Sequence, residues 1–456
     1  MNGRLRLRHG PPHRMSVGQH GGGVRRHAPP VSGRVPALVR DVELSEALPT
    51  VAAHTPDGRR VERVWLLVRL YTEPIGALLL GVPDEGLNPV ALSLAIEDGM
   101  GGAVRDRLAG DGPPPYLARR ADVLLTAPHI TVVVCTREHP RALARCLESL
   151  LAQHYHRFRV LVVDNAPTTG QTAAVVATAA ARGAVDYLVE PTPGLSHARN
   201  RAVAAAPGEI LAWIDDDEVA DPYWLSEIAR ALADHPTADV VTGVVVPAEL
   251  DTDAQLWFEQ FGGHSKGRGF TPDVFSPASA RRQSPLYPLP PFGAGANMTF
   301  RPGVLERIGG FDPALGAGTP AMGSEDTLAF TQVLLAGGTI AYQPSALVRH
   351  YHRRDLTGLR RQLTGYGCGL TAAYTSLILS RPGLIWPLLR LVPRAVRDVL
   401  DADAPRLAGL RADFPADLLR ANRRGMLAGP AAYLRGRRMR RPAGGSGRLP
   451  TVPPPR

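Results

Sequence analysis

The feature that most constrains the fold is a regular alternation of short apolar runs and amphipathic segments, which begins near Pro128. The runs predict strands, and the segments between them predict helices because their apolar residues recur at helical spacing. Strands that alternate with helices are typical of an α/β fold with a doubly wound, mostly parallel sheet. We expect strands over 130–136, 158–165, 184–190, 209–215 and 239–246, and helices over 140–153, 171–181, 195–206 and 222–233.

Polar residues stand where several of these predicted strands end. Thr136 ends "ITVVVCT", Asp164 lies near the end of "FRVLVVDN", and Asp215 ends "EILAWID". Open parallel sheets bind ligands in the crevice outside the carboxyl ends of their strands. These three residues can therefore converge on one ligand site.

Three consecutive carboxylates, Asp215 to Asp217, follow the apolar run "LAWI". Alternate residues of an extended strand point the same way, so Asp215 and Asp217 can face one ligand while Asp216 points away or bonds locally. Carboxylate oxygens suit Mg²⁺ or Mn²⁺, and such ions commonly complete their shell with phosphate oxygens. The pattern predicts a divalent ion that holds a diphosphate. The alternative is that Asp217 or Asp221 caps the helix that begins at Pro222.

Three further segments fit a nucleotide beside such an ion. In "CTREHP", polar groups follow a strand end and can contact a base or ribose, or they can be simple turn residues before a helix. The carboxylate of Asp164 can accept hydrogen bonds from a nucleobase or ribose. "PGLSHARN" begins a helix whose N-terminus, together with Arg199, can meet phosphate. Arg199 can instead pair with a strand-end aspartate.

The order of these segments resembles glycosyltransferase family 2, which has the GT-A fold. The segments are "VVVCTRE", "VVDN", "GLSHARN", "WIDDDE", "GAGANMTFRPGVLERIGGFD", "GSEDT", "LLAGGTIAYQP" and "VRHYH". Each is unspecific alone, and their order and spacing carry the resemblance, which covers about residues 128–352. It implies a nucleotide-sugar donor, an Mg²⁺ or Mn²⁺ ion and inversion at the anomeric carbon. We expect the acceptor to be a hydroxyl of a glycan or of a lipid-linked molecule.

The resemblance places a catalytic base at Asp326 of "GSED", and we take Glu325 as the second choice. A carboxylate there removes the proton from the incoming hydroxyl as the sugar is transferred in one inverting step. The alternative is that both acids only complement the N-terminus of a helix over 325–336. His350, which shares a face with His352 if the chain is extended, matches a position that completes the metal shell in some relatives. A structural role in the strand is the alternative for this histidine.

The expected ligand contacts fall into two sets. Glycines in "PFGAGANMTF" let the backbone approach a bound sugar closely, unless the loop is a plain tight turn. The expected metal ligands, which the resemblance implies, are Asp215, Asp217 and His350. The expected nucleotide-sugar contacts are Thr136, Arg137, Asp164, Arg199, Asp216, Gly295 and Asn297.

The rest of the chain predicts segments around this α/β region. A basic tail rich in Gly, Pro, Arg and His, which predicts disorder, precedes a small hairpin-and-helix accessory domain. After the catalytic domain, a basic and apolar helical segment either lies at a membrane surface or packs as a cap on that domain. A helix and a second disordered basic tail follow. The expected segments are 1–45, 60–110, 128–352, 353–400 and 401–456.

The formal charge of +10 is concentrated at the two ends. Residues 1–40 and 421–456 carry 17 Arg and no acidic residue, which leaves 35 basic and 42 acidic residues between them. An acidic body without a basic patch argues against a nucleic-acid partner. The basic tails can rest on an anionic membrane surface, or they can remain solvated.

Cysteines and apolar runs indicate the compartment. Three widely spaced cysteines argue against a disulfide framework or a zinc site. The N-terminus lacks the apolar region of a secretory signal, and no run reaches the roughly 18 apolar residues that a spanning helix needs. We expect a cytoplasmic protein, with peripheral contact at the inner face of the membrane as an open alternative.

Two functions other than sugar transfer also fit part of this pattern. A nucleotidyltransferase can use a similar sheet and metal, but it normally needs a glycine-rich basic loop after the first strand, and "CTREHP" has no glycine. A non-catalytic homologue that only binds a nucleotide sugar is the second rival. The intact acidic pair and the "SED" segment argue against it.

Overall fold

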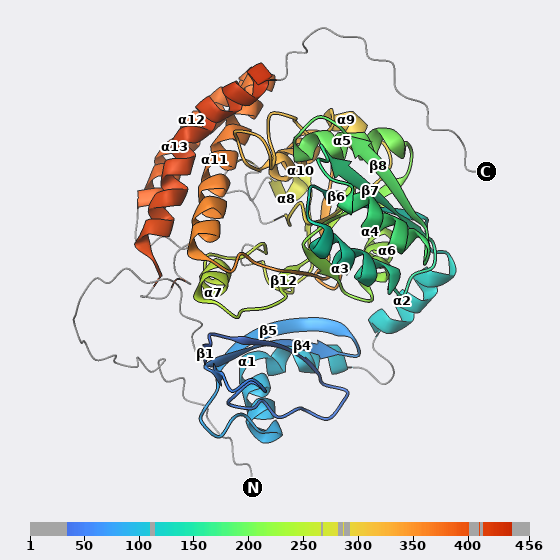
Figure 1. The fold of residues 1–456 in the computed structure, drawn as a ribbon, viewed down its shortest axis with the longest axis vertical. Coiled ribbons are helices and arrows are strands. Elements are labelled where there is room, and N and C mark those ends of the chain that lie inside the picture. Colours follow the sequence, from blue (N-terminus) through green and yellow to red (C-terminus); the bar gives the residue numbers. More distant parts are fainter. Residues whose placement is uncertain are drawn as a thin grey trace.

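The computed structural model describes residues 34–109, 115–265, 268–280, 286, 292–400, 410 and 414–439. Figure 1 shows a small unit of strands and helix near the N-terminus, a large α/β unit, and a group of long helices from the C-terminal part. The α/β fold class predicted from the alternating pattern is confirmed.

The large unit is built on an eight-stranded mixed sheet. Its strands are β6 (Ile130–Thr136), β7 (Phe158–Asn165), β8 (Val185–Glu190), β9 (Ile210–Asp215), β11 (Val240–Thr242), β13 (Asp273–Phe275), β14 (Asn297–Phe300) and β15 (Ile340–Tyr342). Their order is β13-β15-β11-β14-β9-β6-β7-β8. Strands β9, β6, β7 and β8 are parallel neighbours, as are β11 and β15, whereas β14 is antiparallel to both of its neighbours. The parallel half brings the ends of β6, β7 and β9 to one edge, as predicted.

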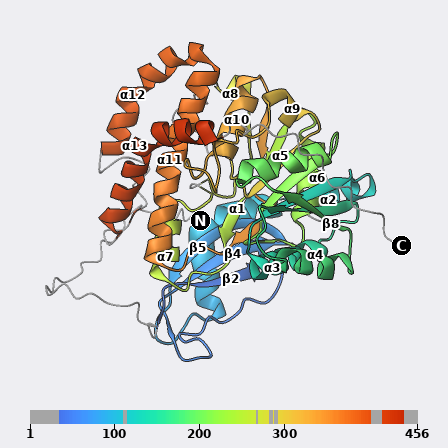
Figure 2. The ribbon, with the colours of Figure 1, turned by 45° about the horizontal axis from the view of Figure 1, so that its top comes forward.

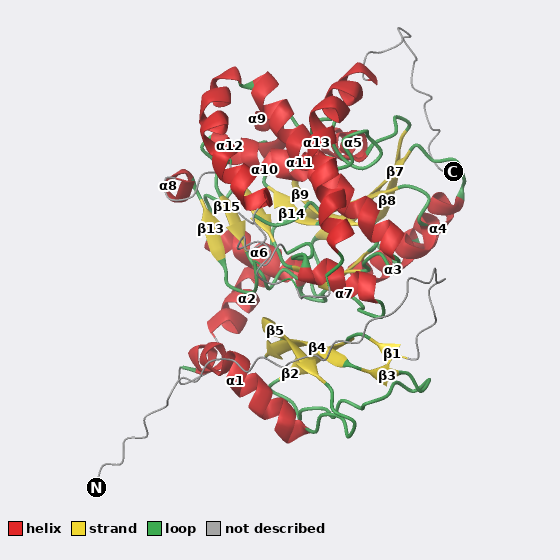
Figure 3. Ribbon diagram, turned by 90° about the vertical axis from the view of Figure 1, so that its left-hand side faces the viewer, coloured by secondary structure: helices red, strands yellow, loops and turns green. Residues whose placement is uncertain are grey.

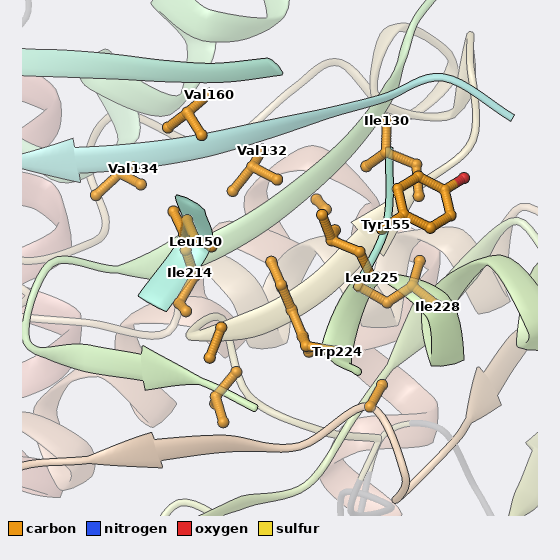
Figure 4. Packing of buried hydrophobic residues seen from close by; sticks show 14 of the residues in the cluster. Ile130, Val132, Val134, Leu150, Tyr155, Val160, Ile214, Trp224, Leu225 and Ile228 are labelled. Carbon is orange, nitrogen blue, oxygen red and sulfur yellow. The ribbon is translucent and has the colours of Figure 1, made fainter. Parts of the chain in front are cut away.

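Different helices cover the two faces of this sheet. They are α2 (Pro115–Leu125), α3 (Pro140–Leu151), α4 (Gln171–Ala180), α5 (Leu195–Ala205), α6 (Trp224–Asp234), α7 (Asp253–Gln260), α8 (Pro277–Ala280), α9 (Val304–Ile308) and α10 (Glu325–Leu335). Alternate residues of β6 point to opposite faces. Val132 packs with Leu150 of α3 and Trp224 of α6, as Figure 4 shows, while Val133 joins a second core with Ala198 of α5 and Phe330 of α10. Both faces are therefore anchored, which fixes the strand ends that carry polar residues.

The strand predicted over 239–246 is interrupted at Gly243. A Cβ atom at this position would lie 1.8 Å from the carbonyl oxygen of Ala346 and 2.5 Å from Nδ2 of Asn297, so only glycine fits. After the break the chain enters a second, three-stranded sheet with the order β10-β16-β12. Its strands are β10 (Glu218–Ala220), β12 (Val245–Pro247) and β16 (Val348–His350). This small sheet brings "VRHYH" beside the acidic turn.

The small N-terminal unit has a three-stranded sheet covered by one helix. Its elements are β1 (Arg34–Val35), β2 (Leu38–Glu43), β3 (Arg60–Val61), β4 (Arg63–Leu70), β5 (Glu73–Gly81) and α1 (Pro89–Leu108). Strands β4 and β5 form the predicted hairpin, and α1 is the helix predicted to follow it. Leu92 and Ile96 hold α1 on the face that points away from the large unit, as Figure 3 shows.

The basic tail expected over residues 1–45 needs a correction at its end. Strand β2 pairs in parallel with β4 and buries Val42, because β4 offers a free edge for backbone hydrogen bonding. The accessory unit therefore begins earlier than residue 60. The part of the expected tail before residue 34 lies outside the described residues.

Charged contacts join the small unit to the large one. Arg69 places Nη2 2.5 Å from Oδ2 of Asp221 and Nε 2.9 Å from Oδ2 of Asp41. The other carboxylate oxygen of Asp221 accepts a hydrogen bond from the backbone N–H of Tyr223, just before α6. Of the two aspartates considered as helix caps, Asp221 thus supports the start of this helix, and it also holds the accessory unit.

Three α-helices and one short 3-10 helix make up the described C-terminal part of the chain. They are α11 (Leu356–Ser380), the short 3-10 helix η1 (Pro382–Leu384), α12 (Ile385–Leu400) and α13 (Ala416–Met439). Figure 2 shows α11 and α13 side by side. Their backbones approach so closely that a Cβ atom at Gly367 would lie 2.0 Å from the carbonyl oxygen of Asn422. The tight fit makes this pair a rigid cap on the large unit.

Residues 353–400 were expected either to lie at a membrane surface or to pack as a cap, and the structure decides this for α11. Leu359, Leu363 and Leu377 of α11 are buried, so this helix packs on the large unit rather than facing a membrane. Part of the basic stretch 421–456 is also ordered, because α13 continues to Met439. None of the described helices combines the length and apolar composition needed to cross a bilayer.

Candidate active site

The acidic turn after β9 lies beside β16. Residues Asp216 and Asp217 form a turn between β9 and β10, and Glu218 of β10 pairs with His350 of β16. This register places His350 Nε2 3.5 Å from Oδ1 of Asp217. Arg353 approaches the other oxygen of Asp217 with Nη2 at 3.8 Å. The acidic pair and His350, expected as metal ligands, therefore occur in one place.

Asp215 and Asp217 sit in opposite electrostatic surroundings. Burial and the neighbouring aspartates raise the pKa of Asp215 to about 6, against the lowering effect of Arg199. The side chain of Asp215 nevertheless retains 37% of its accessible surface, so a ligand can reach it. Burial also acts to raise the pKa of Asp217, but His350 and Arg353 outweigh it and bring this pKa below its usual value.

Asp216 points toward β6, away from the crowded pair. Its Oδ2 accepts a 2.5 Å hydrogen bond from Oγ1 of Thr136 and lies 3.2 Å from Nδ1 of His139. The hydrogen bond to Asp216 raises the pKa of His139. Asp216 thus forms a hydrogen bond within the protein, as expected, and its partner is the end of a neighbouring strand. This hydrogen bond uses the side chains of both Asp216 and Thr136.

The end of β7 supplies a buried acceptor. Asp164 is fully buried, and its Oδ2 accepts a 2.7 Å hydrogen bond from the hydroxyl of Tyr187 on β8. Its Oδ1 has no hydrogen-bond partner within the described part of the chain. Burial raises the pKa of Asp164. A buried acceptor without a donor is costly, so this oxygen suits a donor group on a ligand.

Two residues that the sequence reasoning passed over shape the same edge. Glu138 accepts hydrogen bonds from the backbone N–H groups of Thr168 and Thr169, at 2.6 and 3.0 Å, and so ties the end of β6 to the loop after β7. Asn165 accepts a 2.8 Å hydrogen bond from the N–H of Gly194, before α5. Asn165 stands in "VVDN" beside Asp164, and Glu138 stands in "CTREHP", so both lie in segments that the sequence pointed to without singling out these residues. Arg137, expected at the nucleoside, is exposed next to this edge.

Arg199 of α5 is a buried centre of ion pairs. Its Nη1 lies 2.8 Å from Oε1 of Glu325, and its Nη2 donates to the carbonyl oxygen of Gly295 at 3.1 Å and lies 3.5 Å from Oδ1 of Asp215. Its side chain is only 2% exposed. Arg199 therefore pairs with the strand-end residue Asp215, which was the alternative considered for it. Its guanidinium is buried, so it is not exposed to a phosphate as expected.

Glu325 and Asp326 open α10 but have different environments. Glu325 is buried against Arg199, and burial raises its pKa while Arg199 lowers it. Asp326 is less buried, and its two oxygens accept backbone hydrogen bonds from Gly295 at 2.7 Å and from Thr327 at 2.6 Å. A Cβ atom on Gly295 would lie 2.8 Å from Cβ of Asp326, so the close approach requires glycine. Gly295 thus shapes the site through its backbone.

Asn297 corrects an expectation. It is 1% exposed, and its Oδ1 accepts a 2.9 Å hydrogen bond from Nε1 of Trp224. Its Nδ2 donates to the carbonyl oxygens of Val244 and Ala346, at 3.0 and 2.7 Å. The amide therefore ties the two sheets together instead of contacting a sugar, because the fold needs partners for these buried backbone groups.

A cluster of histidines extends from the acidic turn into the interior. His350 Nδ1 lies 2.7 Å from Nδ1 of His352, and His352 Nε2 lies 2.8 Å from Oε1 of Glu259 on α7. The ring of His264 stacks edge-on against His350 with 4.3 Å between centroids. The i, i+2 spacing of His350 and His352 signalled part of this cluster, whereas Glu259 of α7 and His264 in the turn after that helix carried no signal in the sequence.

The donor set at the turn fits a divalent cation. Two carboxylates and one imidazole nitrogen come from Asp215, Asp217 and His350, and the charge of Asp217 adds to the burial that raises the pKa of Asp215. Crowded carboxylates are stabilised by a cation between them, and oxygen donors with one imidazole suit Mn²⁺ or Mg²⁺. The residues therefore fit the ion that the resemblance implies.

Part of the chain is similar in sequence to known proteins. Residues 131–309 match the family described as glycosyl transferase family 2. The chain is 25% identical over 197 residues to the glucosyl-dolichyl phosphate glucuronosyltransferase of Haloferax volcanii, covering 41% of this chain and 57% of that protein. It is 30% identical over 225 residues to the succinoglycan biosynthesis protein ExoM of Rhizobium meliloti, covering 48% and 66%. The chain thus spans less than two thirds of the length of these relatives.

The chain is also similar to solved structures. The mannosyltransferase PcManGT of Pyrobaculum calidifontis, in complex with GDP-Man and Mn²⁺, is 21% identical and gives a TM-score of 0.40, covering 76% of this chain and 84% of that one. The family match itself includes the strand ends of the sheet, the acidic turn and Gly295, and it ends before Asp326 and His350. Residues 131–309 are thus the part of the chain that is similar to glycosyl transferase family 2.

Proposed function

We propose that the chain is a metal-dependent, inverting hexosyltransferase that moves a sugar from a nucleotide-diphosphate sugar to an acceptor hydroxyl. One observation carries this proposal. The turn after β9 places Asp215 and Asp217 beside His350 of β16, at the sheet edge where β7 presents the buried acceptor Asp164. A cation site and a site for a polar nucleoside therefore share one edge.

The metal side of the site would hold the donor's diphosphate. Asp215, Asp217 and His350 are the proposed ligands of Mn²⁺ or Mg²⁺. When bound, such an ion neutralises the diphosphate leaving group. Asp164 and the exposed Arg137 are the proposed contacts with the nucleoside. Arg199 acts from inside the protein, where it holds Asp215 and Glu325 at fixed positions.

Asp326 is the proposed catalytic base. Hydrogen bonds from the backbone N–H groups of Gly295 and Thr327 hold its carboxylate in place at the start of α10. An ionised carboxylate can accept the proton of the incoming hydroxyl while the sugar is transferred with inversion. Glu325 is less suited to this role because its carboxylate is buried in the ion pair with Arg199.

A carboxamide substitution tests this base. Wild-type protein with Mn²⁺ should be stabilised thermally by one of the UDP-, GDP- or dTDP-sugars, and it should slowly release nucleoside diphosphate from that donor. Asp326→Asn should lose about 10²- to 10⁴-fold of the transfer rate and keep the donor-induced thermal shift. Asp186→Asn on the exposed part of β8 is the matched control. Full activity of Asp326→Asn removes this residue from the mechanism, and a wild type that binds donor but never releases diphosphate favours the non-catalytic rival.

The acceptor is proposed to be carried on a lipid or a growing polysaccharide. The relatives include a protein named for a dolichyl phosphate substrate and one named for succinoglycan biosynthesis. We place this chain in the same broad class of polysaccharide or lipid-linked glycan synthesis. A cytoplasmic enzyme at the inner face of the membrane fits such an acceptor.

Helix α12 is the proposed contact with the membrane surface. Its Leu388 and Leu391 pack against the cap, while Trp386 on the outer side is 70% exposed. Arginines lie beside the exposed apolar residues along the helix. An apolar stripe flanked by basic residues suits the surface of an anionic bilayer. The outer apolar residues are Ile385, Trp386, Leu389, Val392 and Val396, and the arginines are Arg390, Arg394 and Arg397.

Vesicle binding tests the membrane proposal on the full chain. Wild-type protein should co-sediment with vesicles that contain phosphatidylglycerol more than with phosphatidylcholine vesicles. The double substitution Trp386→Ser and Leu389→Ser should reduce this binding. Leu427→Ser, which alters an even more exposed leucine on α13, should leave it unchanged. Equal binding of all three proteins contradicts a role for α12.

A further inference from the structure

A row of four side chains leads from the acidic turn into the interior. His350 Nε2 faces Oδ1 of Asp217 at 3.5 Å. The opposite nitrogen of the same ring, Nδ1, lies 2.7 Å from Nδ1 of His352. The far nitrogen of His352, Nε2, lies 2.8 Å from Oε1 of Glu259. The row contains three gaps between polar atoms, and two of them have hydrogen-bond length.

The protons needed in these gaps can be counted. A gap of hydrogen-bond length between two electronegative atoms requires one proton. Two neutral imidazoles carry two ring protons, and the gaps from Glu259 to His352 and from His352 to His350 use both. The third gap, toward Asp217, is longer than a good hydrogen bond and receives none.

The direction of each hydrogen bond follows from Glu259. An ionised carboxylate only accepts, so Nε2 of His352 donates to it. Nδ1 of His352 then carries the lone pair and accepts from Nδ1–H of His350. Nε2 of His350 is consequently left with a lone pair, and this lone pair faces a carboxylate oxygen of Asp217.

We propose that His352 and Glu259 are positioning residues that hold His350 in the Nδ1–H tautomer, so that its Nε2 presents a lone pair at the acidic turn. This inference rests on the proposed function, because a lone pair beside Asp217 is useful only as a ligand for a cation. A metal-binding histidine commonly donates its other ring N–H to a fixed acceptor, which sets its tautomer and orientation. Here the acceptor is a second histidine, itself oriented by a carboxylate.

The surroundings keep this row in place. His350 and His352 are 4% and 3% exposed. Phe258 packs edge-on against His352, with 4.7 Å between ring centroids. Gln255 donates to the backbone carbonyl of His352 at 3.2 Å. Both rings are thus held by packing as well as by their hydrogen bonds.

A different reading of the cluster is a separate metal centre made of His264, His350 and His352. Their nearest ligand atoms lie within 4.8 Å of one another. Two nitrogens bound to one tetrahedral ion at about 2.0–2.1 Å stand roughly 3.3 Å apart. The 2.7 Å between the Nδ1 atoms of His350 and His352 is shorter, which favours a shared proton over a shared ion.

Nitrogen NMR of the metal-free protein tests the tautomer without reference to activity. In a long-range ¹H–¹⁵N spectrum of protein labelled at histidine, His350 should show a protonated Nδ1 and an unprotonated Nε2. Its signals are assigned by their loss in His350→Asn. A protonated Nε2 on His350, whether as the other tautomer or as the doubly protonated ring, overturns the inference. This measurement uses the wild type and does not depend on the folding of a variant.

Titration with Mn²⁺ alone, followed by the EPR signal of the free ion, tests the consequence. His352→Phe keeps a ring against Phe258 and removes the acceptor for His350, so the affinity for Mn²⁺ should fall about 10- to 100-fold. Glu259→Gln should cause a smaller loss, because an amide can still accept from His352. His264→Phe is the matched control and should change the affinity less than about 2-fold, since His264 is outside the row.

The same titration separates the two proposals. If Asp217→Asn binds Mn²⁺ as tightly as wild type, the proposed metal site itself is wrong. If Asp217→Asn loses binding while His352→Phe keeps it within about 2-fold, the metal site stands and the positioning role of His352 is wrong. A loss in His264→Phe as large as in His352→Phe indicates the three-histidine centre and also overturns the inference.

Discussion

The two sides of the crevice are built from similar residues, yet they are completed differently. The guanidinium of Arg199 contacts the carboxylate of Glu325 at 2.8 Å and the carbonyl oxygen of Gly295 at 3.1 Å. Around Asp217, the basic side chains of His350 and Arg353 stay at 3.5 and 3.8 Å. The first side has its charges paired within the protein. On the second side, the ion pairs of Asp217 within the described part of the chain are no shorter than 3.5 Å.

The Arg199 side is therefore preorganised without a ligand, whereas the Asp217 side is suited to binding a cation. Charges that are buried and fully paired fix the geometry of a site before any ligand arrives. A carboxylate such as Asp215, whose pKa is raised by burial and by neighbouring aspartates, costs stability until a cation joins it. We therefore expect substitutions near Arg199 to affect the stability of the fold, and substitutions near Asp217 to affect the response to divalent ions.

The largest effect is expected from Arg199→Met. It leaves Glu325 as an unpaired carboxylate in a buried position, which should lower the free energy of unfolding by about 3–5 kcal/mol. Urea denaturation measures this change. Arg201→Met, on the same helix but partly exposed, should change stability by less than about 1 kcal/mol. Equal losses in the two variants would remove the distinction between the two sides.

A smaller effect is expected from Asp215→Asn, and it should depend on metal. Without divalent ions the unfolding free energy should change by less than about 1 kcal/mol, because the side chain is partly exposed and its ion pair with Arg199 spans 3.5 Å. Wild type should gain about 2.7 kcal/mol when Mn²⁺ is present at 100 times its dissociation constant, and the variant should gain little. Thermal unfolding with and without MnCl₂ measures both. The same gain in both proteins shows that Asp215 is not a ligand.

The smallest effect is expected from Arg353→Gln. Its guanidinium is 53% exposed and stands 3.8 Å from Asp217, so it competes weakly with a cation for this carboxylate. The affinity for Mn²⁺, measured without donor, should rise by up to about 5-fold, and the gain should shrink at high salt. Arg354→Gln is the control, because Arg354 pairs with Glu249 and Asp251 instead. A lower affinity in Arg353→Gln would mean that this arginine supports the site.

Much of the α/β framework could be predicted because its signals are local. Apolar runs and helical periodicity identified β6, β7 and β9 within a residue or two, and the topology of parallel strands then brought Thr136 and Asp215 to one edge. The spacing of Asp215, Asp216 and Asp217 also predicted that the middle residue bonds elsewhere, as its contact with Thr136 shows. The strand after α6 was placed correctly but its break at Gly243 was not, because the reason is a carbonyl group about a hundred residues away.

The sequence by itself determined which residues stand at the strand ends, because side-chain direction within a strand repeats every two residues and needs no distant partner. Only the tertiary structure decided what those residues meet. Arg199 and Asn297 were equally plausible ligand contacts in the sequence, yet packing buried both among groups from other elements. Glu259 and His352 join the site because α7 and β16 fold against each other. Such contacts depend on how distant segments fill shared space, and a local pattern carries no record of that.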